Sequence, residues 1–375
     1  MSDWPSVPFE RAVINGSSGN AKIQRSSYKT SGLIPIIDQG ESVIAGFTDD
    51  PELAYKGDLP VIIFGDHTRR FKFVDFPFAV GAEGVRVLRS APDFEPRFLF
   101  RYLSSLNIPS AGYSRHFKFL RESTIAAPSF AEQKRIADVL DRVDELRAKR
   151  RVAITLLDDL AQAIFFDMFG DPRVNPKSFS TKALSELVDR GDRINYGVVQ
   201  PGADDPSGIP LVRVGDLIDD RVNHSSLKRI DPEIEAKYKR SRLRGNEILV
   251  GCVGSIGSIA VVGPDEVGFN VARAVARIPI TSNVERLFVA QHLKMPAVQD
   301  YFASQLRTVA QPTLNIKQLS KTVVMVPPIE LQENFFYAIS RLHGLRRKHV
   351  AQLASLDVLF GSLQNKAFRG ELWDD

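Results

Sequence analysis

Two stretches of the chain alternate apolar and charged residues with the period of an α-helix. The first, residues 129–165, reads SFAEQKRIADVLDRVDELRAKRRVAITLLDDLAQAIF. Counting in sevens from Ile136 places apolar residues at nearly all positions that share one side of a helix. Ser129, followed three residues later by Glu132, is a typical helix start. The same spacing recurs from Phe335 near the end of the chain, so we predict two long amphipathic helices.

Each predicted helix carries an apolar stripe that needs a partner surface. A large apolar side chain left in water forgoes roughly 1.5 to 3 kcal/mol. At about 1.5 Å per residue the first helix would be roughly 55 Å long, more than the width of a domain of this size. We therefore predict that the helices pair with each other, antiparallel, with Arg150 and His349 meeting near the middle; packing of each helix on its own domain is the alternative. The predicted seam residues are Ile136, Val143, Leu146, Arg150, Leu157 and Leu160 in the first helix, and Leu342, Leu345, His349, Leu356 and Leu359 in the second.

The two helical stretches are copies of each other. Lys118 and Lys317 stand 199 residues apart, and the same offset relates other identical residues. A fainter repeat precedes each helix, because IPIIDQG at 34–40 matches IPLVRVG at 209–215, and KGDLPVII matches RGNEILVG. The order is therefore domain, helix, domain, helix. The other pairs at this offset are Leu120 and Leu319, Pro128 and Pro327, Gln133 and Gln332, Arg147 and Arg346, and Asp158 and Asp357.

The sequence outside the helices predicts two domains of mixed α/β structure. Short runs rich in Val, Ile and Phe, separated by glycines, are typical of short strands. These runs are 34–38, 59–65, 76–80 and 84–88 in the first domain, and 209–214, 246–251, 258–263 and 272–278 in the second. A helical stretch follows in each domain, at 96–106 and 284–293. The expected fold class is α/β: two mixed α/β domains separated by two long helices that form an antiparallel coiled coil with approximate two-fold symmetry. The predicted boundaries are 1–127 for domain 1, 128–168 for the first helix, 169–326 for domain 2 and 327–375 for the second helix.

Composition and charge narrow the class of protein. The 375 residues are 43% hydrophobic and carry a net charge of +4 with a pI near 9.0, which fits a soluble protein that binds nucleic acid. Cys252 is the one cysteine, so neither an intramolecular disulfide nor a thiolate zinc site can form, and a reducing cytoplasm is expected. MSDWPSVPFE lacks the basic flank and apolar core of a signal peptide, and no apolar run reaches membrane-spanning length. We therefore expect a soluble cytoplasmic protein.

Basic residues gather in short segments that suit a DNA backbone. Five cations occur within eight residues from Lys237 to Arg244, which is the density that phosphate neutralisation needs. A merely solubilising basic face is the alternative. The predicted phosphate contacts are Lys22, Arg25, Tyr28, Lys29, Arg69, Arg70 and Lys72 in domain 1, and Lys237, Tyr238, Lys239, Arg240, Arg242 and Arg244 in domain 2. The predicted base contacts, which need amide or guanidinium groups on nearby loops, are Gln39, Gln200, Arg213, Asn270 and Arg273. Arg115 and His116 could serve instead as caps or core polar groups.

Several longer motifs are similar to those of one protein family. They include PSFAEQKRIADVL followed by AIFFDMFGDPRVNP, the closing KAFRGEL, and the body motifs FGDHTRRFKFVDFPFAVGAEGVRVL and GNEILVGCVGSIGSIAVV. Together they make the chain resemble, over essentially its whole length, the specificity (S) subunit of type I restriction-modification systems. The resemblance implies two target recognition domains, each reading one half of a bipartite DNA sequence, joined by two antiparallel helices that fix the gap between the halves.

The resemblance also implies partners and cofactors. The partners would be double-stranded DNA, two modification subunits that methylate adenine with S-adenosylmethionine, and restriction subunits that translocate DNA with ATP and Mg²⁺. The S subunit itself would perform no chemistry. One departure is that the second helix begins IELQENF where the first has FAEQKRI, so that the acidic residue before Gln332 is lost. If the family's Glu-Gln pair docks a partner, the two docking sites are unequal.

The residues themselves agree with a non-catalytic role. An adenine methyltransferase needs Asn or Asp followed by two prolines and an aromatic residue, and a P-loop ATPase needs GxxxxGK[ST]; the sequence contains neither. The glycines of GCVGSIGSIAVVG have the spacing of a hairpin rather than of a dinucleotide-binding turn. We predict no catalytic, cofactor-binding or metal-binding residues. The alternative functions are a two-module protein-interaction scaffold and an orphan DNA-binding protein.

Overall fold

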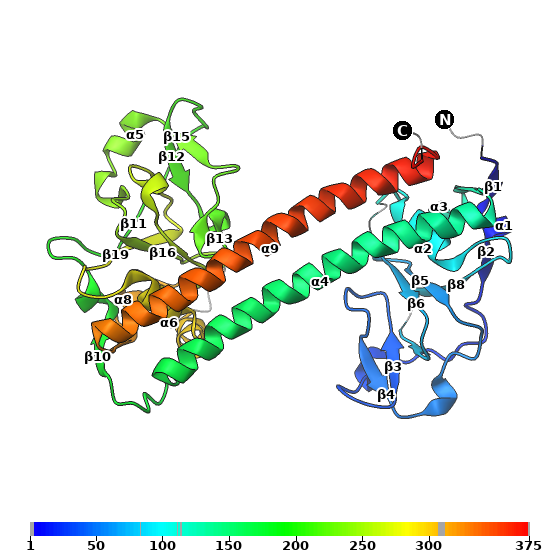
Figure 1. Cartoon of the computed structure of the whole chain (residues 1–375), viewed down its shortest axis with the longest axis horizontal. Helices are drawn as coiled ribbons and strands as arrows, with labels where there is room; N and C mark the ends of the chain where they lie inside the picture. Colours follow the sequence, from blue (N-terminus) through cyan, green and yellow to red (C-terminus); the bar gives the residue numbers. More distant parts are fainter. Residues whose placement is uncertain (1–3, 83, 111, 113–114, 307–311, 374–375) are drawn as a thin grey trace. The chain divides into compact units, whose positions relative to one another are not determined.

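The computed structural model describes residues 4–82, 84–110, 112, 115–306 and 312–373. The chain forms two compact units: unit 1 contains Met1–Val152 and Val350–Asp375, and unit 2 contains Ala153–His349. Two long helices, α4 (Phe130–Phe169) and α9 (Ile329–Arg369), pass from one unit into the other (Figure 1). The two predicted long helices are therefore confirmed, and each begins two residues after the predicted boundary. Each unit is built from one α/β domain and half of each helix.

The centre of unit 1 is a four-stranded antiparallel sheet with the order β2-β8-β5-β6. Its strands are β2 (Val13–Asn15), β8 (Val85–Ser90), β5 (Val61–Gly65) and β6 (Phe71–Val74). A second sheet has the order β4-β3-β7, in which β3 and β7 run parallel. Its strands are β4 (Gly46–Thr48), β3 (Ile34–Ile37) and β7 (Ala79–Val80). The remaining elements of this domain are the strand pair β1 (Ser6–Pro8) and β9 (Thr124–Ala126), with the helices α1 (Phe9–Ala12), α2 (Pro96–Ser105) and α3 (Phe117–Arg121).

Strand β5 shows why the sequence of the domain centre is apolar without alternation. All five of its residues are buried, because both faces of the sheet are covered. Ile62 and Phe64 face a core that includes Phe98 of α2 and Leu140 of α4. Val61 and Ile63 face the opposite core, which contains residues of β3 and β7. The domain therefore packs on the start of α4 through one face and on its own small sheet through the other.

Unit 2 repeats this arrangement strand for strand. Its four-stranded sheet has the order β11-β19-β16-β17, and its three-stranded sheet has the order β15-β12-β18 with β12 and β18 parallel. The strands are β11 (Asn195–Tyr196), β19 (Val275–Pro279), β16 (Glu247–Gly251), β17 (Ile259–Val261), β15 (Lys228–Ile230), β12 (Ile209–Val212), β18 (Asn270–Val271), and the pair β10 (Ser180–Ala183) and β20 (Val323–Val326). The duplication read from the sequence is thus a duplication of topology.

Unit 2 also has elements that unit 1 lacks among the described residues. They are the hairpin β13 (Leu217–Ile218) and β14 (Arg221–Val222), and the helices α5 (Pro232–Ala236) and α7 (Pro296–Ser304). Helices α6 (Arg286–Lys294) and α8 (Ile316–Ser320) take the places of α2 and α3. The strand predicted from the glycine-rich run is confirmed as the antiparallel hairpin of β16 and β17.

The long helices pair antiparallel inside each unit. In unit 1 the start of α4, with Leu140, shares a core with Ala367 near the end of α9. In unit 2 the end of α4, with Phe165, shares a core with Phe335 near the start of α9. These cores also contain the helices of the domains, so each helix end packs on its partner helix and on a domain at once. The two packing modes that the sequence left as alternatives therefore occur together.

The predicted seam needs one correction. Among the positions that repeat every seven residues from Ile136, Ile136 is 0% and Val143 8% exposed. The second set of predicted seam positions is largely exposed, and the buried residue lies one position later, as Leu140 does. The predicted seam residues Leu146, Leu160, Leu345 and Leu359 are 36%, 45%, 48% and 45% exposed. Residues three and four along a helix from a given position flank the same face. At 139–140 both residues are apolar, and the core of unit 1 buries the later one, Leu140. The predicted contact between Arg150 and His349 would join the two units and stays a prediction.

Candidate nucleic-acid interface

The basic segment of unit 2 follows helix α5. Asp231 caps this helix by accepting a hydrogen bond from the backbone N–H of Glu233, and Pro232 occupies its first turn. The chain then turns through a short 3₁₀ helix at 239–241. Three predicted phosphate contacts are exposed there and form no salt bridge with a described residue: Lys237, Lys239 and Arg240. Tyr238 between them is half-buried.

A buried carboxylate anchors this segment from below. Glu235 is 2% exposed, and its carboxylate accepts hydrogen bonds from Arg242 Nε at 2.8 Å and from Asn270 Nδ2 at 3.1 Å. The hydrogen bond from Arg242 holds the pKa of Glu235 below its usual value, and the same pair raises the pKa of Arg242. Ser241 Oγ donates to Asn270 Oδ1 at 2.7 Å. The segment is therefore fixed by one polar cluster at its base, while its other cations remain exposed.

Asn270 was predicted to contact bases, and the structure corrects that prediction. The residue is 0% exposed, and both ends of its amide are occupied by Ser241, Glu235 and the carbonyl of Tyr238. It lies on strand β18 beneath the basic segment, where it cannot reach a duplex. Its role is to satisfy buried polar groups that would otherwise cost about 1–3 kcal/mol each.

A second buried ion cluster lies under Arg244. Arg277, on β19, is 0% exposed and donates to Glu247 Oε1 at 2.7 Å and to Asp192 Oδ2 at 2.9 Å. Burial is the largest single influence and raises the pKa of Asp192, but the hydrogen bonds from Arg277 and from the backbone N–H of Arg193, together with the charges of Arg277 and Arg244, lower that pKa overall. Arg244 joins the cluster from the surface, 3.3 Å from Asp192. Sequence reasoning missed this cluster, because Arg277 sits within an otherwise apolar strand run and its partners are distant in sequence.

Unit 1 exposes cations from several loops rather than from one segment. Lys22 and Arg25 are exposed on the loop that leads to β3. The other predicted contacts are exposed but engaged: Lys29 Nζ lies 2.8 Å from Asp49, Arg70 lies 3.2 Å from Glu41, and Arg69 Nη1 donates to the carbonyl of Ile108 at 3.0 Å. Half-buried Tyr28 accepts from the N–H of Ala82, and burial raises the pKa of its hydroxyl.

Lys72 was predicted to contact phosphate, and its placement corrects that prediction. It is 7% exposed, and its Nζ donates to the carbonyl oxygens of Asp38 at 2.7 Å and Ser42 at 2.6 Å. Burial lowers the pKa of this ammonium group, and the Asp38 carboxylate at 3.7 Å opposes that shift. Lys72 therefore ties the loop after β3 to strand β6, inside the domain.

The remaining predicted base contacts fall into two groups. Gln200 and Arg273 are exposed. Gln39 is half-buried, with its Oε1 accepting from the N–H of His67 at 3.2 Å. Arg213 is exposed but bound to the buried carboxylate of Asp216 at 3.0 Å. Gln39 and Arg213 could therefore read base edges only after leaving these local partners.

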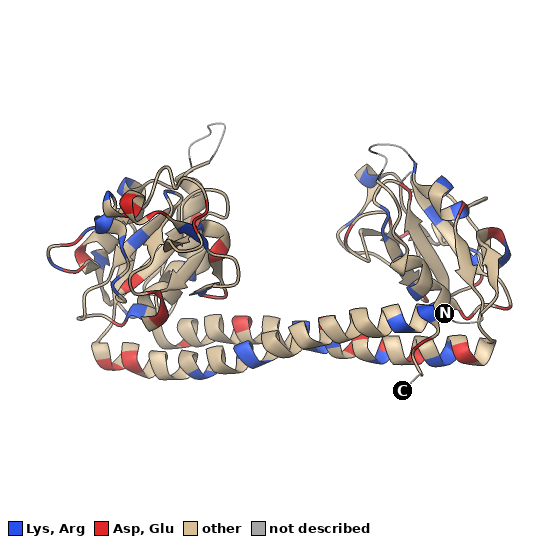
Figure 2. Ribbon diagram, turned by 90° about the horizontal axis from the view of Figure 1, so that it is seen from above, with Lys and Arg blue, Asp and Glu red and all other residues tan. Residues whose placement is uncertain are grey.

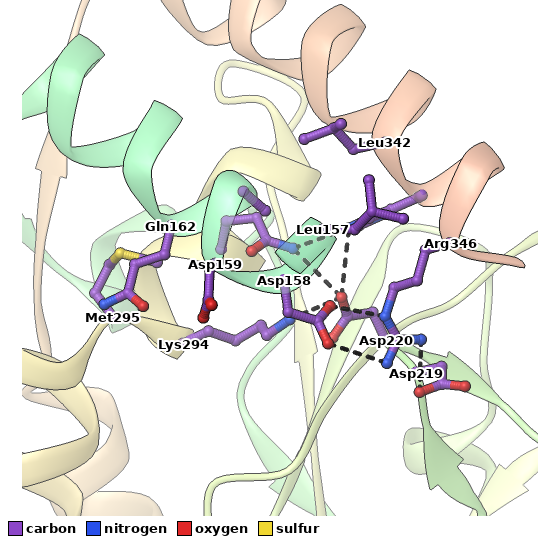
Figure 3. Close-up of a pocket in the computed structure, with 13 residues that line it drawn as sticks. Leu157, Asp158, Asp159, Gln162, Asp219, Asp220, Lys294, Met295, Leu342 and Arg346 are labelled. Atoms are coloured by element: carbon purple, nitrogen blue, oxygen red, sulfur yellow. Dashed lines mark hydrogen bonds and ion pairs between the residues drawn. The ribbon is translucent and has the colours of Figure 1, made fainter. Parts of the chain in front are cut away.

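Basic and acidic positions are interspersed over the loops of both domains and along both long helices (Figure 2). Within unit 2, the hairpin between β13 and β14 brings its turn residues Asp219 and Asp220 against the helices (Figure 3). Both have positive φ, +54° and +63°, as a two-residue hairpin turn requires. Asp219 lies 2.7 Å from Arg346 of α9, and Asp220 lies 2.8 Å from Lys294 of α6. The hairpin thus ties the second domain to α9.

The glutamines at the helix starts are structural clamps. Gln133 accepts from the N–H of Glu95 at 2.8 Å and donates to the carbonyl of Pro128 at 3.0 Å. Gln332 accepts from the N–H of Glu285 at 2.8 Å and donates to the carbonyl of Pro327. Both are 1% exposed. Their repetition at the 199-residue offset therefore reflects one clamp, built twice, between a long helix and the loop before α2 or α6.

Comparison with known proteins places these features in a family. No protein-family model matches the chain. The type I restriction enzyme EcoBI specificity subunit of Escherichia coli is 32% identical over 314 residues, which cover 74% of this chain and 66% of that subunit. The chain belongs to the type I restriction specificity subunits. A second specificity subunit from E. coli, that of EcoR124I/EcoR124II, is 28% identical over 89 residues, or 24% of this chain and 22% of that protein.

Solved structures from type I restriction-modification systems share the fold. The S subunit from M. genitalium superposes with a TM-score of 0.61 at 16% identity, over 98% of this chain and 96% of that chain. A chain from a structure of complex assembly and conformational transition in a type I system superposes with a TM-score of 0.50 at 16% identity, over 98% of both chains. In this specificity subunit, no group of three or more His, Cys, Asp or Glu among the described residues could hold a metal ion. Within the same residues, no helix is long and apolar enough to cross a membrane.

Proposed function

We propose that this chain is the DNA-recognition subunit of a type I restriction-modification complex. The observation that carries the proposal is the 32% identity to a specificity subunit over 314 residues. The duplicated domain supports it, because two related modules can read two separated half-sites on one duplex. The long antiparallel helices would set the number of base pairs between the half-sites. Each domain would then read one half of a bipartite target.

The surface that would meet DNA is the set of exposed candidates in each domain. Cations of this kind contact phosphates and release counterions, which gives sequence-independent affinity. Base reading would fall to exposed side chains beside them. The proposed contacts are Lys22, Arg25, Tyr28, Lys29, Gln39, Arg69 and Arg70 in unit 1, and Gln200, Arg213, Lys237, Tyr238, Lys239, Arg240, Arg242, Arg244 and Arg273 in unit 2.

The chemistry would belong to partner subunits. Two modification subunits would methylate adenine with S-adenosylmethionine, and restriction subunits would translocate and cleave DNA with ATP and Mg²⁺. The absence of an Asn/Asp-Pro-Pro-aromatic motif and of a P-loop in this sequence supports a non-catalytic role for the chain itself. Because its target is cellular and invading DNA, the complex would act in the cytoplasm.

The test is to map methylated adenines in the host genome. We expect one split motif, two short specific sequences separated by a fixed gap, which disappears when the gene for this chain is deleted. Exchanging residues 1–127 for those of a related specificity subunit should change one half of the motif and leave the other half and the gap intact. A methylation pattern that survives the deletion would contradict the proposal and favour an interaction scaffold.

A further inference from the structure

Domain 1 contains a polar cavity, and Lys22 is the one residue of its lining that the function proposed above already uses. It has a volume of about 230 Å³ and opens where the loop before β3 meets the first turn of the chain after β5. Three cations line it, and one buried carboxylate lies at its base. The cations are Lys22, Arg86 and Arg115, and the carboxylate is Asp66.

The carboxylate at the base is already fully engaged. Asp66 is 1% exposed; its Oδ1 accepts from the N–H of Phe117 at 2.8 Å, and its Oδ2 accepts from Arg86 Nε and Nη2 at 3.3 Å. Arg86 also lies over the Phe117 ring, 5.0 Å from its centroid. Asp66 therefore holds Arg86 in one orientation, in which the Nη1 group has no partner among the described residues. Such a buttressed guanidinium is preorganised for an anion.

The other two cations form no ion pair with a described residue. Lys22 and Arg115 are exposed at the cavity, and neither has a side-chain hydrogen bond or ion pair among the described residues. Other exposed cations of unit 1, such as Lys29 and Arg70, do have acidic partners. Ser17 and Ser18 also line the cavity. The cavity thus brings three cations together with one carboxylate, that of Asp66, and the other described residues that line it supply no second anion.

The equivalent place in domain 2 is closed and apolar. The registers of the two central sheets pair Gly65 with Val85 in one domain and Gly251 with Val275 in the other, so Asp66 corresponds to Cys252 and Arg86 to Ala276. The same backbone hydrogen bond follows in each, at 3.0 Å: from His116 to Asp66 and from Leu314 to Cys252. The backbone arrangement at this place is therefore the same in both domains, and only the side chains differ.

The side chains of domain 2 leave no room for an anion. Cys252 is 0% exposed, and burial raises the pKa of its thiol to about 12, so it stays neutral. Tyr196 covers the position from β11 and donates its hydroxyl to the carbonyl of Leu314 at 3.0 Å. A cationic cavity in one copy and an apolar filling in the other indicate a binding site rather than a requirement of the fold.

We propose that this cavity of domain 1 binds one phosphodiester group of the DNA backbone, through Lys22, Arg86 and Arg115. This rests on the proposed function and deepens it: one half-site is held by a phosphate clamp that the other half-site lacks. A phosphate contact fixes the position and orientation of a domain on the duplex, whereas the base contacts supply the sequence. The clamp would therefore set the register of domain 1 without changing the motif that it reads.

The experiment uses the full chain in complex with its modification subunits and a duplex that carries the genomic motif. Lys22→Ala with Arg115→Ala should weaken binding and lower the dependence of log K on log salt by about two units, one for each lost contact. Lys56→Ala with Arg121→Ala removes the same charge from unit 1 at exposed pairs with Glu52 and Glu10, and serves as the control. The control pair should leave the slope almost unchanged.

Neutral methylphosphonate substitutions, placed one at a time, identify the bound group. One position in the half-site of domain 1 should weaken binding by the wild-type complex and have no effect on the Lys22, Arg115 double variant. An equal effect on both proteins, an unchanged salt slope, or a changed methylation motif would overturn the clamp. The clamp would also be overturned if inorganic phosphate stabilised the wild type but not the double variant while no methylphosphonate position on the DNA weakened binding. The cavity would then bind a free phosphate. Failure of the wild-type complex to bind any duplex would instead refute the proposed function.

Discussion

Arg147 of α4 and Asp357 of α9 form an ion pair in unit 1, with Nε 2.6 Å from Oδ1. Unit 2 contains the same pair with the helices exchanged, because Arg346 of α9 lies 2.7 Å from Asp158 of α4. The offset that relates Arg147 to Arg346 also relates Asp158 to Asp357, 199 residues in both cases. The sequence repeat is therefore also a repeat of helix contacts. Both units have the same antiparallel register.

These pairs should contribute modestly to stability. Asp357 and Asp158 are about half exposed, and exposed pairs are worth roughly 0.2–1 kcal/mol. Asp357→Ala and Asp158→Ala should each lower the free energy of unfolding by that amount and add in the double variant, because they lie in different units. Arg147→Ala should cost more, since Arg147 also pairs with Asp144 and lies over the Phe360 ring. Urea unfolding of the single and double variants measures this; strong non-additivity would contradict it.

Two leucines of α4 distinguish the observed seam from the predicted one. Leu140 is 0% exposed within the core of unit 1, whereas Leu146 is 36% exposed. Leu140→Ala should lower the free energy of unfolding by about 2–5 kcal/mol through lost burial and the cavity it leaves. Leu146→Ala removes the same atoms and should cost less than about 1 kcal/mol. Equal losses in thermal or urea unfolding would restore the predicted seam.

Two neighbouring arginines of unit 2 should separate DNA affinity from stability. Arg240→Ala should lower the salt slope of DNA binding by about one unit and change stability by no more than about 0.5 kcal/mol. Arg242→Ala leaves the buried Glu235 carboxylate without its ion partner and should destabilise the unit by about 1–3 kcal/mol. Binding at several salt concentrations, with unfolding measured on the same proteins, tests both. Similar stability of the two variants would show that Glu235 does not depend on Arg242.

His292 should make unit 2 sensitive to acid. It is 0% exposed between Phe165 and Phe288, its Nε2 accepts from the N–H of Met325 at 3.2 Å, and burial lowers its pKa to about 4. Above pH 6.5 both folded and unfolded states are neutral at this residue. As the pH falls from 6.5 towards 4, only the unfolded state takes the proton, so stability falls by roughly 3 kcal/mol in total.

The matched variants for this prediction are His292→Gln and His67→Gln. The first keeps an acceptor for Met325 but does not titrate, so the difference in unfolding free energy between it and the wild type should shrink or reverse as the pH falls from 7 to 4.5. His67 is exposed in unit 1, and its replacement should leave the pH dependence as it was. If His292→Gln and the wild type lose stability in parallel, another group controls the acid response.

The internal repeat made most of the fold predictable. Identical residues at one offset identify two copies, and the short apolar runs between glycines, such as 59–65, become strands in both. Gln133 and Gln332 were found by the same repeat, but their clamping role was not, because it depends on carbonyl groups that only the folded loops bring within reach. Lys72 carries no sequence signal that separates a buried ammonium from an exposed one.

The sequence by itself determined the duplication, the two long helices and the family, because periodicity and repetition are properties of the order of residues. Tertiary structure alone decided which leucines form the seam, which cations face solvent, and that Asp66 and Cys252 occupy one position with opposite chemistry. Those outcomes depend on which side chains distant segments bring together. Burial and pairing of a polar group are set by those neighbours and not by its own place in the chain.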